Sequence, residues 1–113
     1  MQKFRVMDVI IEDKDLELLF DHQTSKKYKK LAKDVKFLER LGFVRNLLEN
    51  EENASGLSKY SYLRYEKLRE NLSGYSSIRI MNGRVERLIF TEHEGGITIK
   101  LIELNQDHYG NKK

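Results

Sequence analysis

The chain has 113 residues, of which 39% are apolar and 35% charged, and its 21 basic and 18 acidic side chains give a formal net charge of +3. This length predicts one domain over residues 1–113 with a modest core. No stretch approaches the roughly 20 apolar residues of a membrane-spanning helix, and acidic residues stand near the start, where a signal peptide would be apolar. The absence of cysteine excludes disulfides and thiolate chemistry. We therefore expect a cytoplasmic protein with no membrane contact, metal or cofactor.

The first half of the chain contains a β-rich start and two helical patterns. Residues 3–11 are apolar and β-branched, which predicts an opening strand. Asp13 or Asp15 is suited to cap a short helix that runs to Phe20. A longer helix is predicted over about residues 25–50, because steps of three, four and seven place its apolar residues on one stripe. These residues are Leu31, Val35, Leu38, Leu41 and Leu48.

Positive charge is concentrated in the same region. Residues 26–45 hold eight lysines and arginines and two acids, a local net charge of +6. Such a concentration is typical of a surface that binds a polyanion, most simply nucleic acid, although a solvated helix face is the alternative. The residues that we expect to contact RNA here are Lys26, Lys27, Lys30 and Lys33.

The second half reads as three strands after a polar loop at residues 50–56. The strands are predicted at residues 75–80, 84–91 and 97–104. Asn82-Gly83 is suited to the tight turn between the first two, and Gly95-Gly96 marks the next turn. The order is strand–helix–helix–three strands. It predicts an α+β fold with a small, twisted, mainly antiparallel sheet and helices packed on one face.

Three sequence stretches resemble RelE/HigB/YoeB-type toxins of type II toxin–antitoxin systems. Residues 65–80 (YEKLRENLSGYSSIRI) are similar to the family's Leu-basic pair followed by a Leu-Ser-Gly-aromatic turn into a strand. Residues 87–90 (RLIF) resemble its Arg-apolar-apolar-aromatic strand, and residues 107–109 (DHY) its His/Tyr-bearing end. The resemblance covers roughly residues 63–109. It implies a microbial-RNase-like sheet and cleavage of mRNA in the ribosomal A site.

The resemblance also implies roles for single residues. Glu66 matches a general-base glutamate, Arg87 a phosphate-stabilising arginine, and His108 with Tyr109 the terminal pair in which the histidine is the acid. The RNA-contacting positions are Arg69, Arg79 and Asp107. Residues 110–113 follow the motif as a tail that we expect to be flexible.

Metal-free RNA cleavage by itself needs residues of the same types. It requires a base for the ribose 2′-hydroxyl, cations at the phosphate and an acid for the leaving oxygen. Glu66, Arg79 with Arg87, and His108 supply these in type. Alternation along the strands does not fix which sheet face holds Arg87. Each residue also has a plain alternative: a surface carboxylate, structural ion-pair arginines and an inert terminal histidine.

Tyr60, Tyr62, Tyr65 and Tyr75 form a tyrosine-rich stretch that could stack on bases, but about half of them are expected to fill the core. Glu92, His93 and Glu94 offer metal-binding side chain types without a second histidine at ligand spacing.

Three functions compete at this point. The first is a ribosome-dependent, metal-independent mRNA endoribonuclease, whose partners would be the ribosome, mRNA and a helix-turn-helix antitoxin that carries the pair to operator DNA. The second is a non-catalytic ParE-like toxin or interaction module. Lys67 in place of a family proline and the order Asp-His-Tyr motivate this alternative. The third is a free-standing RNase, which would lack the ribosome's help in positioning its substrate.

Overall fold

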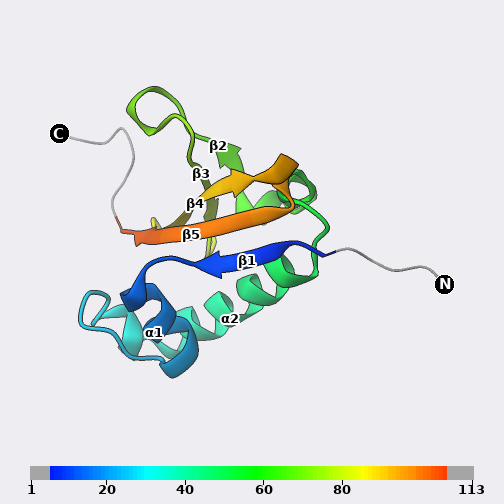
Figure 1. Cartoon of the computed structure of the whole chain (residues 1–113). Helices are drawn as coiled ribbons and strands as arrows, with labels where there is room; N and C mark the ends of the chain where they lie inside the picture. The colour runs from blue at the N-terminus through cyan, green and yellow to red at the C-terminus, as the bar shows by residue number, and fades with distance from the viewer. Residues whose placement is uncertain (1–5, 107–113) are drawn as a thin grey trace.

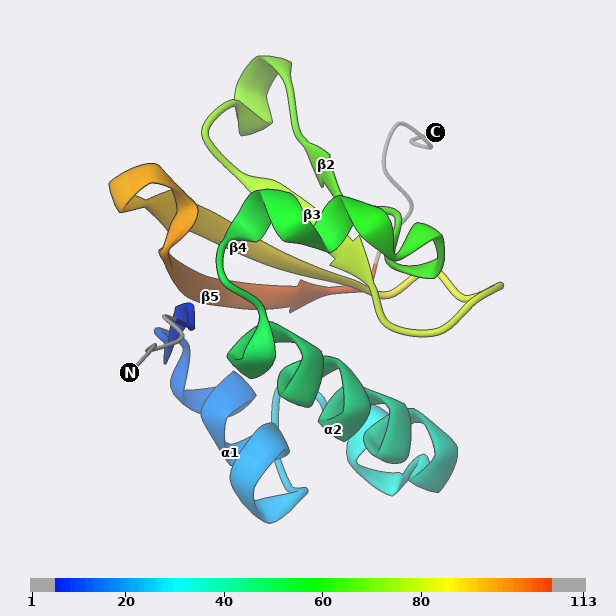
Figure 2. The same ribbon diagram turned by 90° about the vertical axis from the view of Figure 1, so that its right-hand side faces the viewer.

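The computed structural model describes residues 6–106 and shows a sheet covered on one face by helices (Figures 1 and 2). The helices are α1 (Lys14–His22) and α2 (Val35–Asn50). The strands are β1 (Asp8–Ile11), β2 (Glu66–Lys67), β3 (Ser76–Arg79), β4 (Arg87–His93) and β5 (Thr98–Asn105). The predicted α+β class and the placement of the helices are confirmed.

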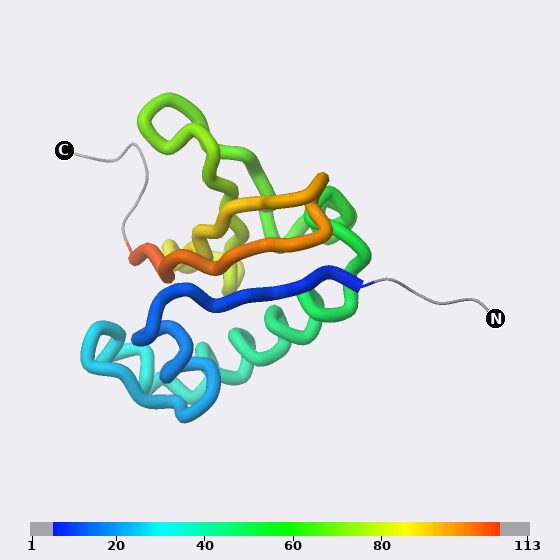
Figure 3. Tube along the Cα trace, in the orientation of Figure 1, coloured from blue at the N-terminus to red at the C-terminus, as the bar shows by residue number. Residues whose placement is uncertain are grey.

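The sheet has the strand order β1-β5-β4-β3-β2. β1 pairs in parallel with β5, and the other neighbours are antiparallel. The first and last described strands therefore lie side by side, as the trace in Figure 3 shows. The two-residue strand β2 was not predicted, because two residues are too short for a periodic signal.

The first helix follows its prediction closely. Asp13 caps α1, since its carboxylate accepts a hydrogen bond from the Leu16 N–H at 3.2 Å. The helix buries Leu16 and Leu19 and ends at His22, two residues beyond the predicted end. Local capping and helical spacing were sufficient signals here.

The second helix was predicted ten residues too long at its start. It begins at Val35, because the Asp34 carboxylate accepts a hydrogen bond from the Phe37 N–H at 3.1 Å and caps a new helix there. Upstream, the Ser25 hydroxyl accepts one from the Tyr28 N–H at 3.1 Å. Such side-chain bonds compete with helix formation. Residues 25–34 are therefore turns and a short 3-10 helix (Leu31–Lys33).

The position of Tyr28 explains why residues 25–34 do not form part of a regular α-helix. β1 ends at Ile11, opposite Leu101 of β5, so the Leu104 N–H beyond it lacks a strand neighbour on that edge. The buried Tyr28 hydroxyl accepts that hydrogen bond at 3.0 Å. Burial raises the pKa of this phenol, which stays neutral and able to play this role.

The core lies between the sheet and the helices. Leu88 and Phe90 of β4 face the same side as Leu104 and Leu101, their partners on β5. They pack with the apolar stripe of α2, whose buried members are Phe37, Leu41, Val44 and Leu48. Among the described helices, none is long and apolar enough to cross a bilayer.

The connection between β3 and β4 differs from the predicted tight hairpin. A turn does form at Asn82-Gly83, where the Arg84 N–H donates to the Met81 carbonyl at 3.2 Å and Gly83 has a φ of 84°. However, the strands end at Arg79 and begin again at Arg87. Arg84 accounts for the difference, because it donates to Asp34 at 2.8 Å and thereby ties the connection to the start of α2.

Candidate active site

The sheet face opposite the core carries the candidate residues. Arg79 of β3 lies directly opposite Arg87 of β4, and Ser77 lies opposite Ile89. Glu66 of β2 lies opposite Ser77. Since directly paired residues point to the same side of a sheet, these five share the face that Leu88 and Phe90 do not use. We call this surface the open face; it settles the orientation of Arg87 that alternation alone left undecided.

Arg87 joins the three strands on the open face. Its Nη1 donates to Glu66 Oε2 at 3.0 Å and lies 3.4 Å from the Ser77 hydroxyl. The arginine side chain is 18% exposed, whereas that of Glu66 is 53% exposed. The carboxylate is therefore at the rim, in contact with water, and the guanidinium lies deeper against the sheet.

Arg79 lies beside Arg87, and a backbone carbonyl holds its guanidinium group. Its Nη1 donates to the Arg84 carbonyl at 2.7 Å, so the β3–β4 connection positions this guanidinium. Its Nε is buried and has no hydrogen-bond acceptor among the described residues. Burial lowers the pKa of Arg79, and the neighbouring charges of Arg87 and Arg64 lower it further. The charge of Glu66 acts in the opposite sense on this pKa.

The arrangement can bind an anion and accept a proton. Arginine presents a fork of N–H donors that matches the oxygens of a phosphate. Two such groups on adjacent strands, with a rim carboxylate within hydrogen-bond distance of one of them, suit a phosphodiester beside a hydroxyl that must lose its proton. Among the described residues, no group of three His, Asp or Glu side chains could hold a metal ion.

The other predicted RNA contacts lie apart from the arginine pair. Arg69 is exposed in the connection between β2 and β3. Lys26, Lys27, Lys30 and Lys33 are exposed in the connection between α1 and α2, in the helical layer (Figure 1). The prediction that they lie on a long helix is wrong, because they lie in the turns and the short 3-10 helix between α1 and α2. Asp107, His108, Tyr109 and the tail at 110–113 lie outside the described residues.

Arg64 is the site residue that sequence reasoning missed. It is exposed, has a left-handed φ of 50°, and lies close enough to Arg79 to lower its pKa. It precedes β2 in a segment without regular periodicity, so no pattern marked it. The nearby tyrosines divide as expected: Tyr60 and Tyr65 pack against the core, whereas Tyr62 is exposed.

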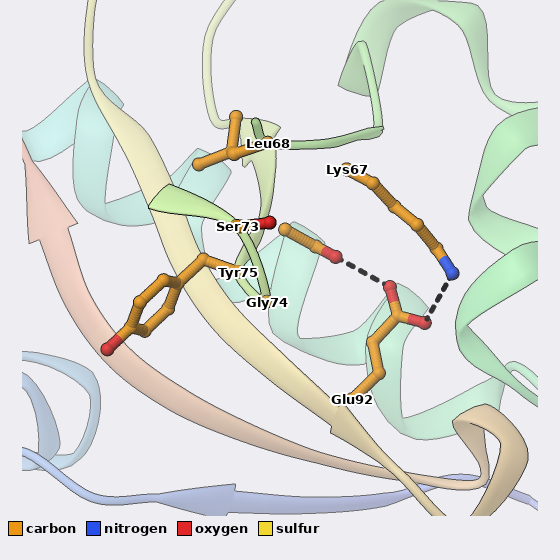
Figure 4. Close-up of a pocket in the computed structure, with 7 residues that line it drawn as sticks. Lys67, Leu68, Ser73, Gly74, Tyr75 and Glu92 are labelled. Carbon is orange, nitrogen blue, oxygen red and sulfur yellow. Dashed lines mark hydrogen bonds and ion pairs between the residues drawn. The ribbon is translucent and has the colours of Figure 1, made fainter. Parts of the chain in front are cut away.

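A hollow of about 340 Å³ lies beside Glu92, which is on the core-facing side of β4 (Figure 4). The Glu92 carboxylate accepts hydrogen bonds from Tyr65 at 2.6 Å and Ser76 at 2.7 Å, and Lys67 lies 3.8 Å away. Burial and this carboxylate raise the pKa of Tyr65. Glu92 is thus a structural acceptor. His93 points to the other face and shares a hydrogen bond with Thr91.

Comparison with known proteins identifies the fold that carries these residues. No family model and no curated protein sequence matches the chain. Among solved structures, the YoeB/ParE toxin from Agrobacterium tumefaciens superimposes with a TM-score of 0.53 at 12% identity, over 90% of this chain and 100% of that one. The fold is that of a YoeB/ParE-type toxin. In this YoeB/ParE-type fold, Glu66, Arg79 and Arg87 come together on the open face, as reported above.

Two further structures cover the chain to a similar extent. The YoeB dimer from Staphylococcus aureus has a TM-score of 0.49 at 23% identity, over 91% of this chain and 98% of that one. The heterotetrameric YoeB-YefM toxin-antitoxin complex from the same organism has a TM-score of 0.48 at 21% identity, with the same coverage.

Proposed function

We propose that the chain is the toxin of a toxin–antitoxin pair and an endoribonuclease that cleaves mRNA in the ribosomal A site. The observation that carries the proposal is the direct opposition of Arg79 and Arg87 across β3 and β4. Like charges in this position destabilise a strand pair. Glu66, at the exposed rim, forms its ion pair with Arg87, and its charge offsets only part of the repulsion on Arg79. A phosphodiester bound between the two guanidinium groups would relieve the repulsion.

Cleavage follows from the positions of these groups. The bound phosphate would compete with Glu66 for Arg87, which frees the carboxylate to take the proton of the ribose 2′-hydroxyl. The 2′-oxygen then attacks the phosphorus, and Arg79 and Arg87 stabilise the added negative charge of the transition state. The 5′-oxygen leaves with a proton from an acid. No metal ion is needed for any of these steps.

The acid is assigned to His108, with Tyr109 and Asp107 beside the substrate. Asn105, at the end of β5, lies directly opposite Arg87. His108 follows three residues later in the sequence. Three extended residues span at most about 10 Å, so the chain length is compatible with an imidazole at the leaving oxygen.

The basic connection between α1 and α2 is proposed to hold ribosomal RNA. Lys26, Lys30 and Lys33 are exposed and form no ion pair within the described part of the chain. Lys27 lies 3.9 Å from Asp13, a weak contact at the surface. Arg69 is proposed as a further RNA contact. Free lysines of this kind bind phosphates in a salt-dependent manner.

The remaining partner is proposed to be an antitoxin. A protein that cuts mRNA in its own cell must be neutralised, and a helix-turn-helix DNA-binding protein would serve both that purpose and repression at operator DNA. The cytoplasm is the compartment in which all these partners occur.

A translation reaction with purified protein tests the proposal. We expect mRNA ends mapped by primer extension to fall within the A-site codon of stalled ribosomes, and free mRNA to stay intact. Growth arrest in cells without such cuts would contradict it. A parallel DNA supercoiling assay then distinguishes the ParE-like alternative, because inhibition of a topoisomerase would leave mRNA intact.

A further inference from the structure

A cavity of about 500 Å³ opens on the open face beside the arginine pair, within the size range of small-ligand sites. Its floor is Ile89, which lies opposite Ser77 and two residues along β4 from Arg87. Residues two apart on a strand share a face and are separated by about 7 Å. This is comparable to the separation between the phosphate and the base of one nucleotide.

The walls of the cavity are apolar and aromatic. Leu72, itself 36% exposed, and Tyr75 come from the connection between β2 and β3 and line the cavity together with Ile89. Tyr75 lines both this cavity and the hollow beside Glu92. Figure 4 shows its ring pointing away from Glu92 and Lys67. An aromatic ring in a cavity lined by aliphatic side chains offers an unpaired base a surface on which to stack.

The polar side chains that line the cavity are Glu103 and Asn105 of β5 and Asn71 of the connection between β2 and β3. Glu103 of β5 lies directly opposite Ile89, and the Asn105 side-chain amide donates to Glu103 Oε2 at 3.3 Å. A carboxylate only accepts hydrogen bonds. Guanine presents two adjacent donors on its Watson–Crick edge, N1–H and the N2 amino group. Adenine, cytosine and uracil each present an acceptor beside their donor, which a carboxylate repels.

We propose that this cavity is a guanine-binding subsite, with Tyr75 stacked on the base and Glu103 paired to its N1–H and N2 amino group. The inference rests on the proposed function, since the phosphate of the same nucleotide would lie at Arg87. Glu103 thereby determines which base is accepted, and Tyr75 supplies affinity without selecting a base.

The Glu103→Gln variant tests the assignment sharply. A glutamine amide offers one acceptor and one donor, which match the N6 amino group and N1 of adenine. NMR titrations with guanosine and adenosine 5′-monophosphate should show that the wild type prefers guanine. The variant should reverse that order, with a change in the affinity ratio of roughly tenfold to a hundredfold. Glu39→Gln on α2, an exposed position, is the matched control and should keep the wild-type ratio.

Tyr75→Leu provides a second signature. The substitution should lower the affinity for both nucleotides by a similar factor and leave the ratio of the two affinities unchanged, because stacking is tolerant of base identity. Equal affinities in the wild type, or an unchanged order in Glu103→Gln, would overturn the subsite. Loss of antitoxin binding in Glu103→Gln without any change in nucleotide preference would also overturn it and assign the cavity to the antitoxin.

The nucleotide titration separates this inference from the function on which it rests. If the protein cuts no mRNA but shows Glu103-dependent guanine preference, the subsite holds and the proposed function fails. If the protein cuts mRNA with the same sequence preference in wild type and Glu103→Gln, and binds both nucleotides equally, the function holds and the subsite fails.

Discussion

Replacing Arg87 with alanine separates a catalytic role for this residue from a structural one. Its ion pair with Glu66 joins a carboxylate that is 53% exposed, and ion pairs with such solvent contact contribute about 1 kcal/mol or less. Stabilisation of charge in a transition state is larger, roughly 2.7–4 kcal/mol for one donor, or about 10² to 10³ in rate. We therefore expect a loss of activity far beyond the loss of stability.

The assay is the rate of mRNA cleavage in a translation reaction, beside urea unfolding of the same samples. Arg45→Ala is the matched control. Arg45 lies on α2 and forms comparable ion pairs, with Asp21 at 2.8 Å and Glu49 at 3.1 Å. The Arg45→Ala variant should lose about as much free energy of unfolding as Arg87→Ala and keep full cleavage activity. Cleavage by Arg87→Ala at a third or more of the wild-type rate, or an equal loss in Arg45→Ala, would refute the reasoning.

Two further predictions concern stability and docking. Arg84→Met removes the cation that binds the buried Glu86 at 3.0 Å, and should lower the free energy of unfolding by about 2 kcal/mol in urea. Arg84 lowers the pKa of Asp34, which adds stability above about pH 4 that is lost as the pH falls through the folded pKa. The difference between wild type and variant should therefore narrow below about pH 4, and a constant difference would contradict this. Charge reversal of Lys30 and Lys33 should weaken ribosome co-sedimentation about tenfold and flatten its salt dependence. Unchanged binding would remove this segment from the interface.

Those parts of the fold that depend on local signals could be predicted from the sequence. The Asp13 cap, the apolar spacing of α1 and the three late strands each carry their own pattern, and the observed bounds differ by a few residues. The start of α2 could not be predicted in this way. Leu31 continues the apolar stripe of the helix, but Tyr28 is required by Leu104, a contact 76 residues away in the sequence. A helical pattern does not record such a requirement.

The candidate site, too, has features that the sequence predicts and features that depend on contacts between distant residues. Glu66, Arg79 and Arg87 were identified by residue type and motif, and the pairing of three strands brings them together. Their common face depends on strand register, which follows from the length of the β3–β4 connection and from Arg84. The cavity around Ile89 depends on a loop and two strands at once. No linear pattern could have predicted it.

The most direct test of the central claim uses an mRNA with a single 2′-deoxynucleotide immediately 5′ of the cut. If the open face activates the ribose 2′-hydroxyl, this substitution abolishes cleavage at that bond in the ribosome. Cuts at the all-ribose bond should then leave a 5′-hydroxyl and a 2′,3′-cyclic phosphate. Cleavage of the deoxy-substituted bond at the normal rate would contradict the mechanism.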